Sequence, residues 1–484
     1  MANAIQGLKP EGVWKFFAEI SKIPRGSKNE AAITEYVAAT AKKLGLEVKT
    51  DQVGNVVVRK PASKGRQKAR MVCLQGHLDM VCEKNKDKTH DFLKDPIELV
   101  RKGNILMADG TTLGADNGIA VATNLALMAD RALEHPPLEF LFTVDEETGL
   151  TGANNLGTGF LQSKTLLNLD SEEEGALYVG CSGGRDAHGH WQLELDAAPA
   201  GWVTVEVRVR GLKGGHSGLE IDKGRGNAIK ILNRVLMRLA RQGARIASIS
   251  GGNKHNAIPR EAEARFAIPQ KNLDTATRLV AELESILKAE VASVDPGLTI
   301  ALEVFPKRKI RVFKKALQKK LLQTVSALPH GVIKMSADIP GLVETSTNVA
   351  VIKTEKKTVT MVTSQRSSVA SEIDEIAETV QTVFALGGAD VQASDGYPGW
   401  KPNMNSEILQ IAKSTFVQEF GREPEVKAIH AGLECGIIGE KYPGMDMVSF
   451  GPTLEGVHSP DEKIYIDTVE RFWTYLLAVL KSIK

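Results

Sequence analysis

The stretch LEFLFTVDEE, residues 138–147, sets a mostly apolar run directly before three acidic side chains. Comparable short apolar runs occur at Asn55–Val58 (NVVV), Met71–Leu74 (MVCL) and Thr165–Leu169 (TLLNL). Continuous apolar runs of this length are typical of strands buried on both faces, as in a parallel or mixed α/β sheet. Segments with apolar residues at helical spacing lie between them, at Ala31–Leu44 and Gly118–Met128. The first part of the chain is therefore predicted to be an α/β domain with a mixed, largely parallel sheet.

The pattern changes after about residue 186. Trp202–Arg210 (WVTVEVRVR) alternates strictly, with valines on one face and Thr204, Glu206 and two arginines on the other. Strict alternation predicts a strand with one exposed face, as in an antiparallel sheet. An amphipathic helix is expected at Asn227–Gln242 and a second alternating strand at Thr358–Thr363. The middle region is therefore predicted to be an α+β domain.

The first pattern returns from Asp395 onward, with a helix expected at Asn405–Glu419 and a buried strand at Met445–Phe450. An insertion into one α/β domain explains this order of patterns. We therefore expect a discontinuous catalytic domain of residues 1–186 and 395–484, interrupted by an α+β lid domain of residues 187–394.

Length, charge and cysteine content exclude several classes of protein. A chain of 484 residues is long enough for two or more hydrophobic cores. Its 61 Lys and Arg against 59 Asp and Glu argue against a protein that binds nucleic acid or a membrane surface. The four cysteines form no CxxC pair, so a reducing compartment fits better than a disulfide scaffold or a Cys-type zinc site. Without a secretory leader pattern or an apolar run of about 18 residues, the chain is predicted to be cytoplasmic.

Four of the apolar runs lead into acidic or histidine residues. The residues that follow them are His77 and Asp79; Asp145, Glu146 and Glu147; Asp170; and His458. In open α/β sheets, ligands collect beyond the carboxyl ends of the strands, so these side chains are expected to converge at one edge. Asp116, in the glycine-rich stretch DGTTLGADNG, is a further candidate.

These residue types suit a metal site. Histidine and carboxylate ligands without cysteine favour a catalytic Zn²⁺ or Mn²⁺ site. His77 and Asp79 point to the same side of an extended chain, so Asp79 can hold the far ring nitrogen of His77. Glu146 and Glu147 are adjacent and diverge, so one can bind metal while the other stays free as a base. Asp116 has two oxygens, which could bridge two ions at roughly 3.5–4 Å.

Several stretches of the sequence carry a resemblance to a known family. They are HLDMVCEKN (77–85), GTTLGADNG (110–118), NLDSEEEG (168–175), LKGGHSGLEI (212–221), NAIPRE (256–261), YPGWKPN (397–403), HAGLECG (430–436) and GPTLEGVHSPDE (451–462). In these stretches, and in the order of its candidate ligands, the chain resembles the two-zinc aminoacylase and carboxypeptidase-like metallopeptidases. The resemblance extends from about Val53 to Glu462. It implies a catalytic α/β domain with an inserted lid domain.

The resemblance also assigns roles at the metal site. It implies that His77 and Asp170 bind one metal ion and that Glu147 and His458 bind the other. Asp116 would bind both ions. Asp79 would then orient His77, and Glu146 would be the general base.

In the lid, the resemblance implies that His216 donates to the oxyanion, in some dimeric members from the partner subunit. The alternative is a polar loop histidine beside a glycine turn. The resemblance also implies that Arg366 and Asn256 lie at lid positions that bind substrate in similar enzymes. Arginine suits the bidentate binding of a carboxylate. His430 and Glu434 are a candidate pocket pair, with a structural role as the alternative.

Together these features predict a cytoplasmic dipeptidase that acts on unblocked dipeptides with two divalent metal ions. Zn²⁺ is expected, with Mn²⁺ or Co²⁺ as alternatives, and the resemblance implies a preference for C-terminal histidine. The alternatives are an amidohydrolase of N-acyl amino acids with the same type of site and a non-catalytic peptide-binding protein. Small peptides are the expected partners, together with a second copy of the chain bound through the lid.

Overall fold

The computed structural model describes residues 2–305 and 310–484, which form two compact units. Unit 1 contains the chain up to Gly180 together with Trp400–Ala428 and Leu433–Lys484. Unit 2 contains Cys181–Gly399 and the short return Ile429–Gly432. This short segment contains His430. The domain boundaries predicted from the sequence do not include a separate segment there.

Unit 1 is built on a mixed eight-stranded sheet in the order β1-β2-β6-β3-β7-β23-β8-β22. Its strands are β1 (Glu47–Thr50), β2 (Val56–Lys60), β3 (Val72–His77), β6 (Leu138–Thr143), β7 (Thr165–Asn168), β8 (Ala176–Cys181), β22 (Glu425–Ile429) and β23 (Asp446–Ser449). The neighbouring strands β6, β3, β7 and β23 are parallel, whereas β1–β2, β2–β6 and β23–β8 pair antiparallel. The predicted mixed α/β sheet is therefore confirmed.

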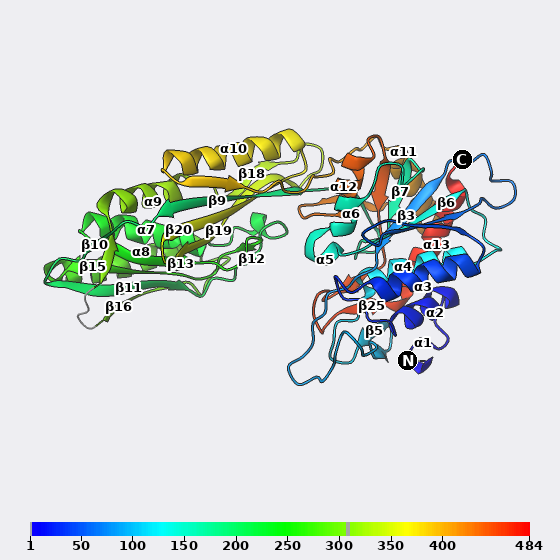
Figure 1. Cartoon of the computed structure of the whole chain (residues 1–484), viewed down its shortest axis with the longest axis horizontal. Coiled ribbons are helices and arrows are strands. Elements are labelled where there is room, and N and C mark those ends of the chain that lie inside the picture. The colour runs from blue at the N-terminus through cyan, green and yellow to red at the C-terminus, as the bar shows by residue number, and fades with distance from the viewer. Residues whose placement is uncertain (1, 306–309) are drawn as a thin grey trace. The chain divides into compact units, whose positions relative to one another are not determined.

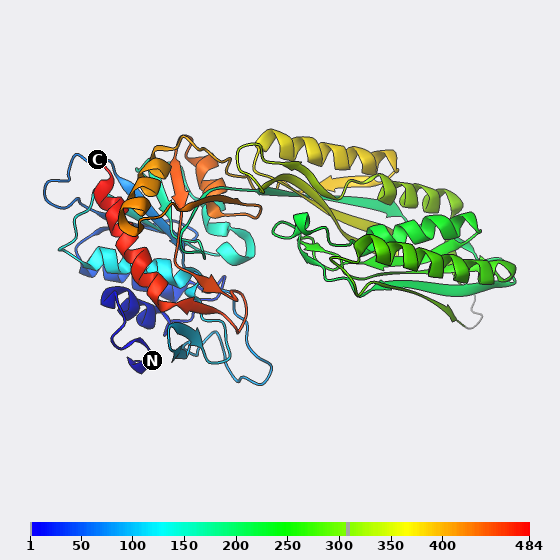
Figure 2. The same ribbon diagram turned by 180° about the vertical axis from the view of Figure 1, so that it is seen from behind.

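Helices cover both faces of this sheet. They are α1 (Ala2–Ile5), α2 (Glu11–Ile20), α3 (Ala31–Lys43), α4 (Ala115–Ala129), α5 (Glu146–Gly149), α6 (Thr151–Asn155), α11 (Glu407–Phe420), α12 (Glu434–Lys441) and α13 (Ile466–Ser482). Figure 1 shows α2, α3 and α4 side by side, and Figure 2 shows α11 and α13, in orange and red, beside each other. Helix α4 contacts the sheet at Gly76. Helices α11 and α13 cover the same face further along the sheet, through Asp446 and Phe450. Helix α12 lies on the opposite face, where Glu434 accepts from Gln75. The apolar strands are thus enclosed, which leaves the strand ends as the place for polar chemistry. No helix in residues 2–305 and 310–484 has the length and apolarity needed to cross a membrane.

A smaller antiparallel sheet in unit 1 anchors the loop that carries His458. Its order is β24-β25-β5-β4, with β4 (Leu99–Lys102), β5 (Ile105–Ala108), β24 (Leu454–Glu455) and β25 (Lys463–Tyr465). Residues 456–462 connect β24 to β25, and β25 pairs with β5. The His458 loop is therefore held beside the segment that leads from β5 to Asp116.

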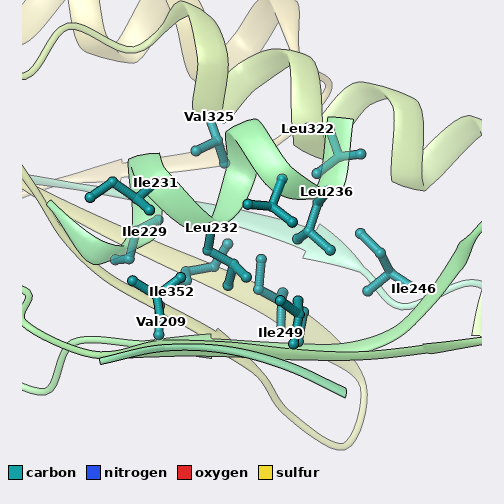
Figure 3. Close-up of a cluster of buried hydrophobic side chains, with 14 of the residues drawn as sticks. Val209, Ile229, Ile231, Leu232, Leu236, Ile246, Ile249, Leu322, Val325 and Ile352 are labelled. Atoms are coloured by element: carbon teal, nitrogen blue, oxygen red, sulfur yellow. The ribbon is translucent and has the colours of Figure 1, made fainter. Parts of the chain in front are cut away.

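Unit 2 contains a nine-stranded sheet in the order β16-β11-β15-β13-β19-β20-β9-β21, with β18 paired to β19. Its strands are β9 (Gly183–Gln192), β11 (Trp202–Arg210), β13 (Arg245–Gly251), β15 (Ala262–Pro269), β16 (Thr299–Phe305), β18 (Gly331–Met335), β19 (Val343–Thr354), β20 (Thr358–Ser367) and β21 (Asp390–Ala393). The remaining elements are α7 (Ala228–Arg241), α8 (Leu273–Val291), α9 (Lys315–Ala327), α10 (Ala370–Leu386), β10 (Leu195–Ala197), β12 (Gly215–His216), β14 (Ala257–Ile258), β17 (Arg311–Phe313) and two short 3₁₀ helices, η1 (Ile221–Lys223) and η2 (Gln270–Asn272). Figure 3 shows Leu232 and Leu236 of α7 packed onto sheet residues such as Val209 and Ile352.

One strand of unit 2 differs from its prediction. The valines of β11 are buried as expected, but Thr204 and Glu206 on the opposite face are buried as well. Arg265, on the neighbouring strand β15, donates to the Glu206 carboxylate at 2.8 and 3.1 Å. The prediction of an exposed face is therefore wrong at these positions, because long arginine side chains cover the sheet there.

A buried ion pair in the unit 1 sheet gives a test of stability. Arg59 Nε lies 2.9 Å from Oε1 of Glu139, whose side chain is fully buried. Arg59→Met removes the cation and leaves that carboxylate unpaired, so we expect the free energy of unfolding to fall by about 3 kcal/mol. Lys49→Met, which breaks the exposed 3.5 Å pair with Glu47, should cost less than about 1 kcal/mol. Urea denaturation measures both, and equal effects would contradict this account.

Candidate metal centre

Three parallel strands of unit 1 bring the predicted ligands together. His77 is the last residue of β3, Asp145 to Glu147 come just after β6, and Asp170 comes just after β7. Because β3 pairs with both β6 and β7 in parallel, the carboxyl ends of all three strands meet at one edge. β3 continues past its predicted end at Leu74 because its pairing with β6 extends to His77 opposite Thr143.

Four groups of the described residues could hold a metal ion, and two of them contain Asp116. His77, Asp116 and Asp170 form the first of these two. Nε2 of His77 lies 3.1 Å from Oδ1 of Asp116 and 3.4 Å from Oδ1 of Asp170. Two ligand atoms of a tetrahedral ion, with bonds of about 2.0–2.1 Å, lie roughly 3.3 Å apart. The observed separations are therefore those of atoms that can share one ion.

Asp116, Glu147 and His458 form the second group. Nε2 of His458 lies 3.1 Å from Oδ2 of Asp116 and 3.0 Å from Oε2 of Glu147. Asp116 thus presents Oδ1 to the first group and Oδ2 to the second, as a bridging carboxylate does. Oδ1 of Asp170 and Oε1 of Glu147 are buried without a hydrogen-bond partner. Such orphaned carboxylate oxygens fit a site whose missing partner is a cation.

The pKa shifts at the site also indicate that its carboxylates are stabilised by positive charge. Hydrogen bonds to Asp116 and Glu147 raise the pKa of His458 to about 11. Burial alone would lower the pKa of His77, but Asp170, Asp116 and Asp79 raise it well above its usual value. Burial, together with the neighbouring carboxylates, raises the pKa of Asp170 to about 6. Without a cation, protons on the imidazoles supply the charge that these carboxylates need.

Asp79 lies behind His77 and fixes two parts of the site. Its Oδ1 is 3.3 Å from Nδ1 of His77, and its carboxylate accepts the backbone N–H groups of Glu146 at 3.0 Å and Glu147 at 3.2 Å. Ser27 Oγ donates to it at 2.8 Å. Burial would raise the pKa of Asp79, but the His77 ring, the backbone N–H of Glu146 and the Ser27 hydroxyl together lower it to about 2. Asp79 therefore stays ionised and ties the His77 ring to the turn that carries both glutamates.

Glu146 has the properties of a base. Asp145 before it adopts φ 50°, a left-handed conformation that aspartate tolerates better than most residues. The Glu146 carboxylate makes no hydrogen bond with any residue in the described ranges, so it is free to approach a substrate. Burial raises the pKa of Glu146 well above its usual range, and the charges of Asp170 and Glu434 add to this effect. A carboxylate with high proton affinity suits general-base chemistry near neutral pH.

The predicted lid residues His216, Asn256 and Arg366 all belong to unit 2. His216 is in β12 beside β14, and Asn256 precedes β14. Nδ1 of His216 accepts the backbone N–H groups of Gly218 at 3.2 Å and Leu219 at 3.1 Å. Burial, with the charge of Arg366, lowers the pKa of His216 to about 4. The neutral ring therefore carries its proton on Nε2, which leaves that N–H free to donate.

The candidate pocket pair is divided between the units. In unit 2, His430 Nε2 lies 2.7 Å from Ser346 Oγ, and burial lowers the pKa of His430 to about 3. In unit 1, Glu434 Oε2 accepts from Gln75 Nε2 at 2.6 Å and Thr143 Oγ1 at 2.7 Å. Burial raises the pKa of Glu434 to about 7. Each residue is thus held by contacts within its own unit.

Sequence reasoning missed Tyr397, which holds Arg366. Arg366 Nη1 donates to the Tyr397 hydroxyl at 3.0 Å. A Cβ atom on Gly184 or Gly432 would lie 2.6 or 2.9 Å from the Tyr397 side chain, so the two glycines form a slot for the ring. The backbones of Tyr397 and Gly184 also exchange hydrogen bonds in both directions, each at 3.0 Å. The only signal in the sequence was the aromatic residue in the motif YPGWKPN.

Comparisons with known proteins extend these observations. The sequence model of peptidase family M20/M25/M40 matches residues 73–482. The chain is 43% identical over 482 residues to the cytosol non-specific dipeptidase of Escherichia coli (strain K12), covering 99% of each. It matches the crystal structure of aminoacylhistidine dipeptidase from Vibrio alginolyticus with a TM-score of 0.91 and 43% identity, over 99% of this chain and 98% of that one. Aminopeptidase PepT from Bacillus cereus shares the fold at 17% identity, with a TM-score of 0.58 over 98% of this chain and 99% of that one.

Proposed function

Since the chain belongs to peptidase family M20/M25/M40 and is a dipeptidase, we propose that it hydrolyses unblocked dipeptides with two divalent metal ions and a glutamate base. The observation that carries this proposal is Asp116, whose two oxygens each lie 3.1 Å from a different histidine nitrogen. A preference for C-terminal histidine is supported by the name of the Vibrio relative.

We assign the metal ligands as follows. His77 and Asp170 would hold one ion, Glu147 and His458 would hold the other, and Asp116 would bind both. Zn²⁺ suits these ligands, with Mn²⁺ or Co²⁺ as alternatives. When bound, the two cations lower the pKa of the attacking water and polarise the peptide carbonyl.

In unit 1, Glu146 would transfer the proton during hydrolysis, and Asp79 would fix the proton on His77. Glu146 accepts the proton of the attacking water and delivers it to the leaving amine, which its raised pKa favours. Asp79 keeps the proton of His77 on Nδ1, so that Nε2 is available as a ligand.

The side chains of unit 2 are proposed to hold the substrate, as a lid domain. His216 would donate its Nε2 proton to the oxyanion, because its Nδ1 is already an acceptor. Arg366 would bind the terminal carboxylate with the N–H groups that Tyr397 leaves free. Asn256 would supply a further hydrogen bond to the substrate.

The test of this function removes metal with a chelator and restores single ions. Free dipeptides, including Xaa-His, and their N-acetylated forms are then assayed. We expect stripping to abolish cleavage of free dipeptides and Zn²⁺, Mn²⁺ or Co²⁺ to restore it. Activity confined to N-acetylated substrates would identify an amidohydrolase instead. A metal-loaded protein that binds dipeptides without cleaving them would be a peptide-binding protein.

The raised pKa values of the two histidine ligands predict that metal binding to the stripped protein releases protons. With raised pKa values, the imidazoles of His77 and His458 are protonated near neutral pH. Metal needs the neutral imidazole, so loading should release about two protons per chain and metal affinity should rise with pH. Calorimetric titrations with Zn²⁺ in buffers of different ionisation enthalpy measure this release, and His458→Ala should release about one proton fewer. A release near zero in every buffer would contradict the prediction.

We also propose a cytoplasmic homodimer that assembles through unit 2. The location is supported by the word cytosol in the name of the Escherichia coli relative. The dimer is supported by exposed apolar side chains on β18, namely Val332, Ile333 and Met335. Small-angle scattering should show a dimer, and a monomer at all concentrations would also remove any role for His216 in a partner's site.

A further inference from the structure

The Glu462 carboxylate is buried against the segment that ends at Asp116. Its side chain lies in the loop between β24 and β25, four residues after His458, and is 2% exposed. Oε2 accepts the backbone N–H groups of Leu113 at 2.8 Å and Gly114 at 2.9 Å. Oε1 accepts those of Ala115 at 2.7 Å and Asp116 at 3.3 Å. One carboxylate thus fixes four consecutive peptide groups.

Arg25 holds the same segment from another direction. It is 3% exposed, and Nη1 donates to the backbone oxygens of Leu78 and Asp79, each at 3.0 Å. Nη2 donates to the backbone oxygen of Gly114. A Cβ atom on Gly114 or Gly118 would lie 2.6 or 2.5 Å from Nη2, so both glycines leave the space that the guanidinium fills. Arg25 therefore joins the loop after His77 to the loop before Asp116.

These contacts connect three segments that each carry a metal ligand. Glu462 connects the His458 loop to Asp116, and Arg25 connects Asp116 to the loop of His77. Burying a carboxylate and a guanidinium is costly unless their hydrogen bonds are satisfied, and here four peptide N–H groups and three carbonyls satisfy them. A bridging carboxylate must also be placed to within about 0.5 Å to serve two ions. The hydrogen bonds to the backbone of residues 113–116 provide that placement.

We propose that Glu462, supported by Arg25, is a positioning residue of the two-metal centre. It sets the Asp116 backbone relative to His458, so that the two Asp116 oxygens face two different ions. This role rests on the proposed two-metal function, and it adds to that function a residue that touches neither metal nor substrate.

The test compares Glu462→Gln with Glu455→Gln. Glutamine keeps the shape of the side chain, but its NH₂ group cannot accept the peptide N–H groups that one carboxylate oxygen now binds. Glu455 lies on β24 at the other end of the same loop, and its exposed side chain pairs with Lys463 at 2.8 Å. Glu455→Gln therefore makes the same chemical change without altering the contacts to residues 113–116.

Metal-stripped proteins are titrated with Mn²⁺, and bound metal is measured together with the electron paramagnetic resonance signal of exchange-coupled Mn²⁺ pairs. We expect wild type and Glu455→Gln to bind two ions per chain as a coupled pair. Glu462→Gln should need about 10–100-fold more Mn²⁺ to fill the site and should lose the coupled signal. A merely structural residue would lower the melting temperature without uncoupling the ions that remain bound.

Unchanged affinity and coupling in Glu462→Gln would overturn the role of Glu462 alone. If wild type fails to bind a coupled pair, the two-metal function fails and this role fails with it. Should Glu462→Gln not fold, Glu462→Asp decides the question. It keeps the charge and all acceptor sites but shortens the reach, so a roughly tenfold weaker affinity is expected, and wild-type affinity would overturn the proposal.

Discussion

Glu146→Gln is expected to lower kcat for a free dipeptide by about 10²–10⁴-fold while both metal ions stay bound. Glutamine has the shape of glutamate, but it cannot take a proton from water or return one to the leaving amine. The Glu146 carboxylate makes no hydrogen bond with the described residues, so its replacement should leave the neighbouring ligands in place. Its backbone N–H, which donates to Asp79 at 3.0 Å, is unaffected by the substitution.

The matched control is Glu147→Gln, one residue further along the same turn. Its carboxylate lies 3.0 Å from His458 Nε2, so this variant should lose metal content together with activity. Steady-state kinetics and metal analysis of both proteins separate a base from a ligand. Undiminished turnover in Glu146→Gln would overturn the proposed mechanism.

Asp116→Ala is expected to remove both metal ions, because its Oδ1 lies beside His77 and its Oδ2 beside His458, in two different ligand groups. In the proposed mechanism, the two ions provide several kcal/mol of transition-state stabilisation. Activity should therefore fall by at least about 10³-fold. In the proposed assignment, Asp170→Ala and Glu147→Ala each remove a ligand of one ion only. Each of these variants should therefore bind one ion more weakly and keep the other ion bound. Metal content after dialysis measures this difference, and retention of one tightly bound ion by Asp116→Ala would contradict the bridging arrangement.

The parallel centre of the unit 1 sheet could be predicted from the sequence because its signals are local. Leu138–Thr143 is mostly apolar and is buried along its whole length because the strand is covered on both faces, and the acidic residues follow where the strand ends. Parallel pairing then places His77 and the turn at Glu146 at one edge without further information. The convergence of the candidate ligands follows from those two facts.

Other features could not be predicted because they depend on contacts between distant residues. Nothing in the local sequence shows that Glu462 binds peptide groups some 350 residues earlier in the chain, or that Arg25 joins two loops of the site. The burial of Glu206 depends on an arginine from another strand. A hydropathy pattern treats such charged residues as exposed, whereas the fold satisfies their hydrogen bonds in the interior.

The position of β23 has a consequence for biosynthesis. This strand pairs with β7 in parallel and with β8 antiparallel, so Asp446–Ser449 complete the sheet between two strands that are synthesised some 270 residues earlier. The nine strands of the unit 2 sheet, in contrast, all lie between Gly183 and Ala393. On the ribosome, the inserted unit can therefore complete its sheet while the N-terminal segment still lacks an interior strand. Until residue 446 has emerged, the edges of β7 and β8 are open to chaperones and to neighbouring nascent chains.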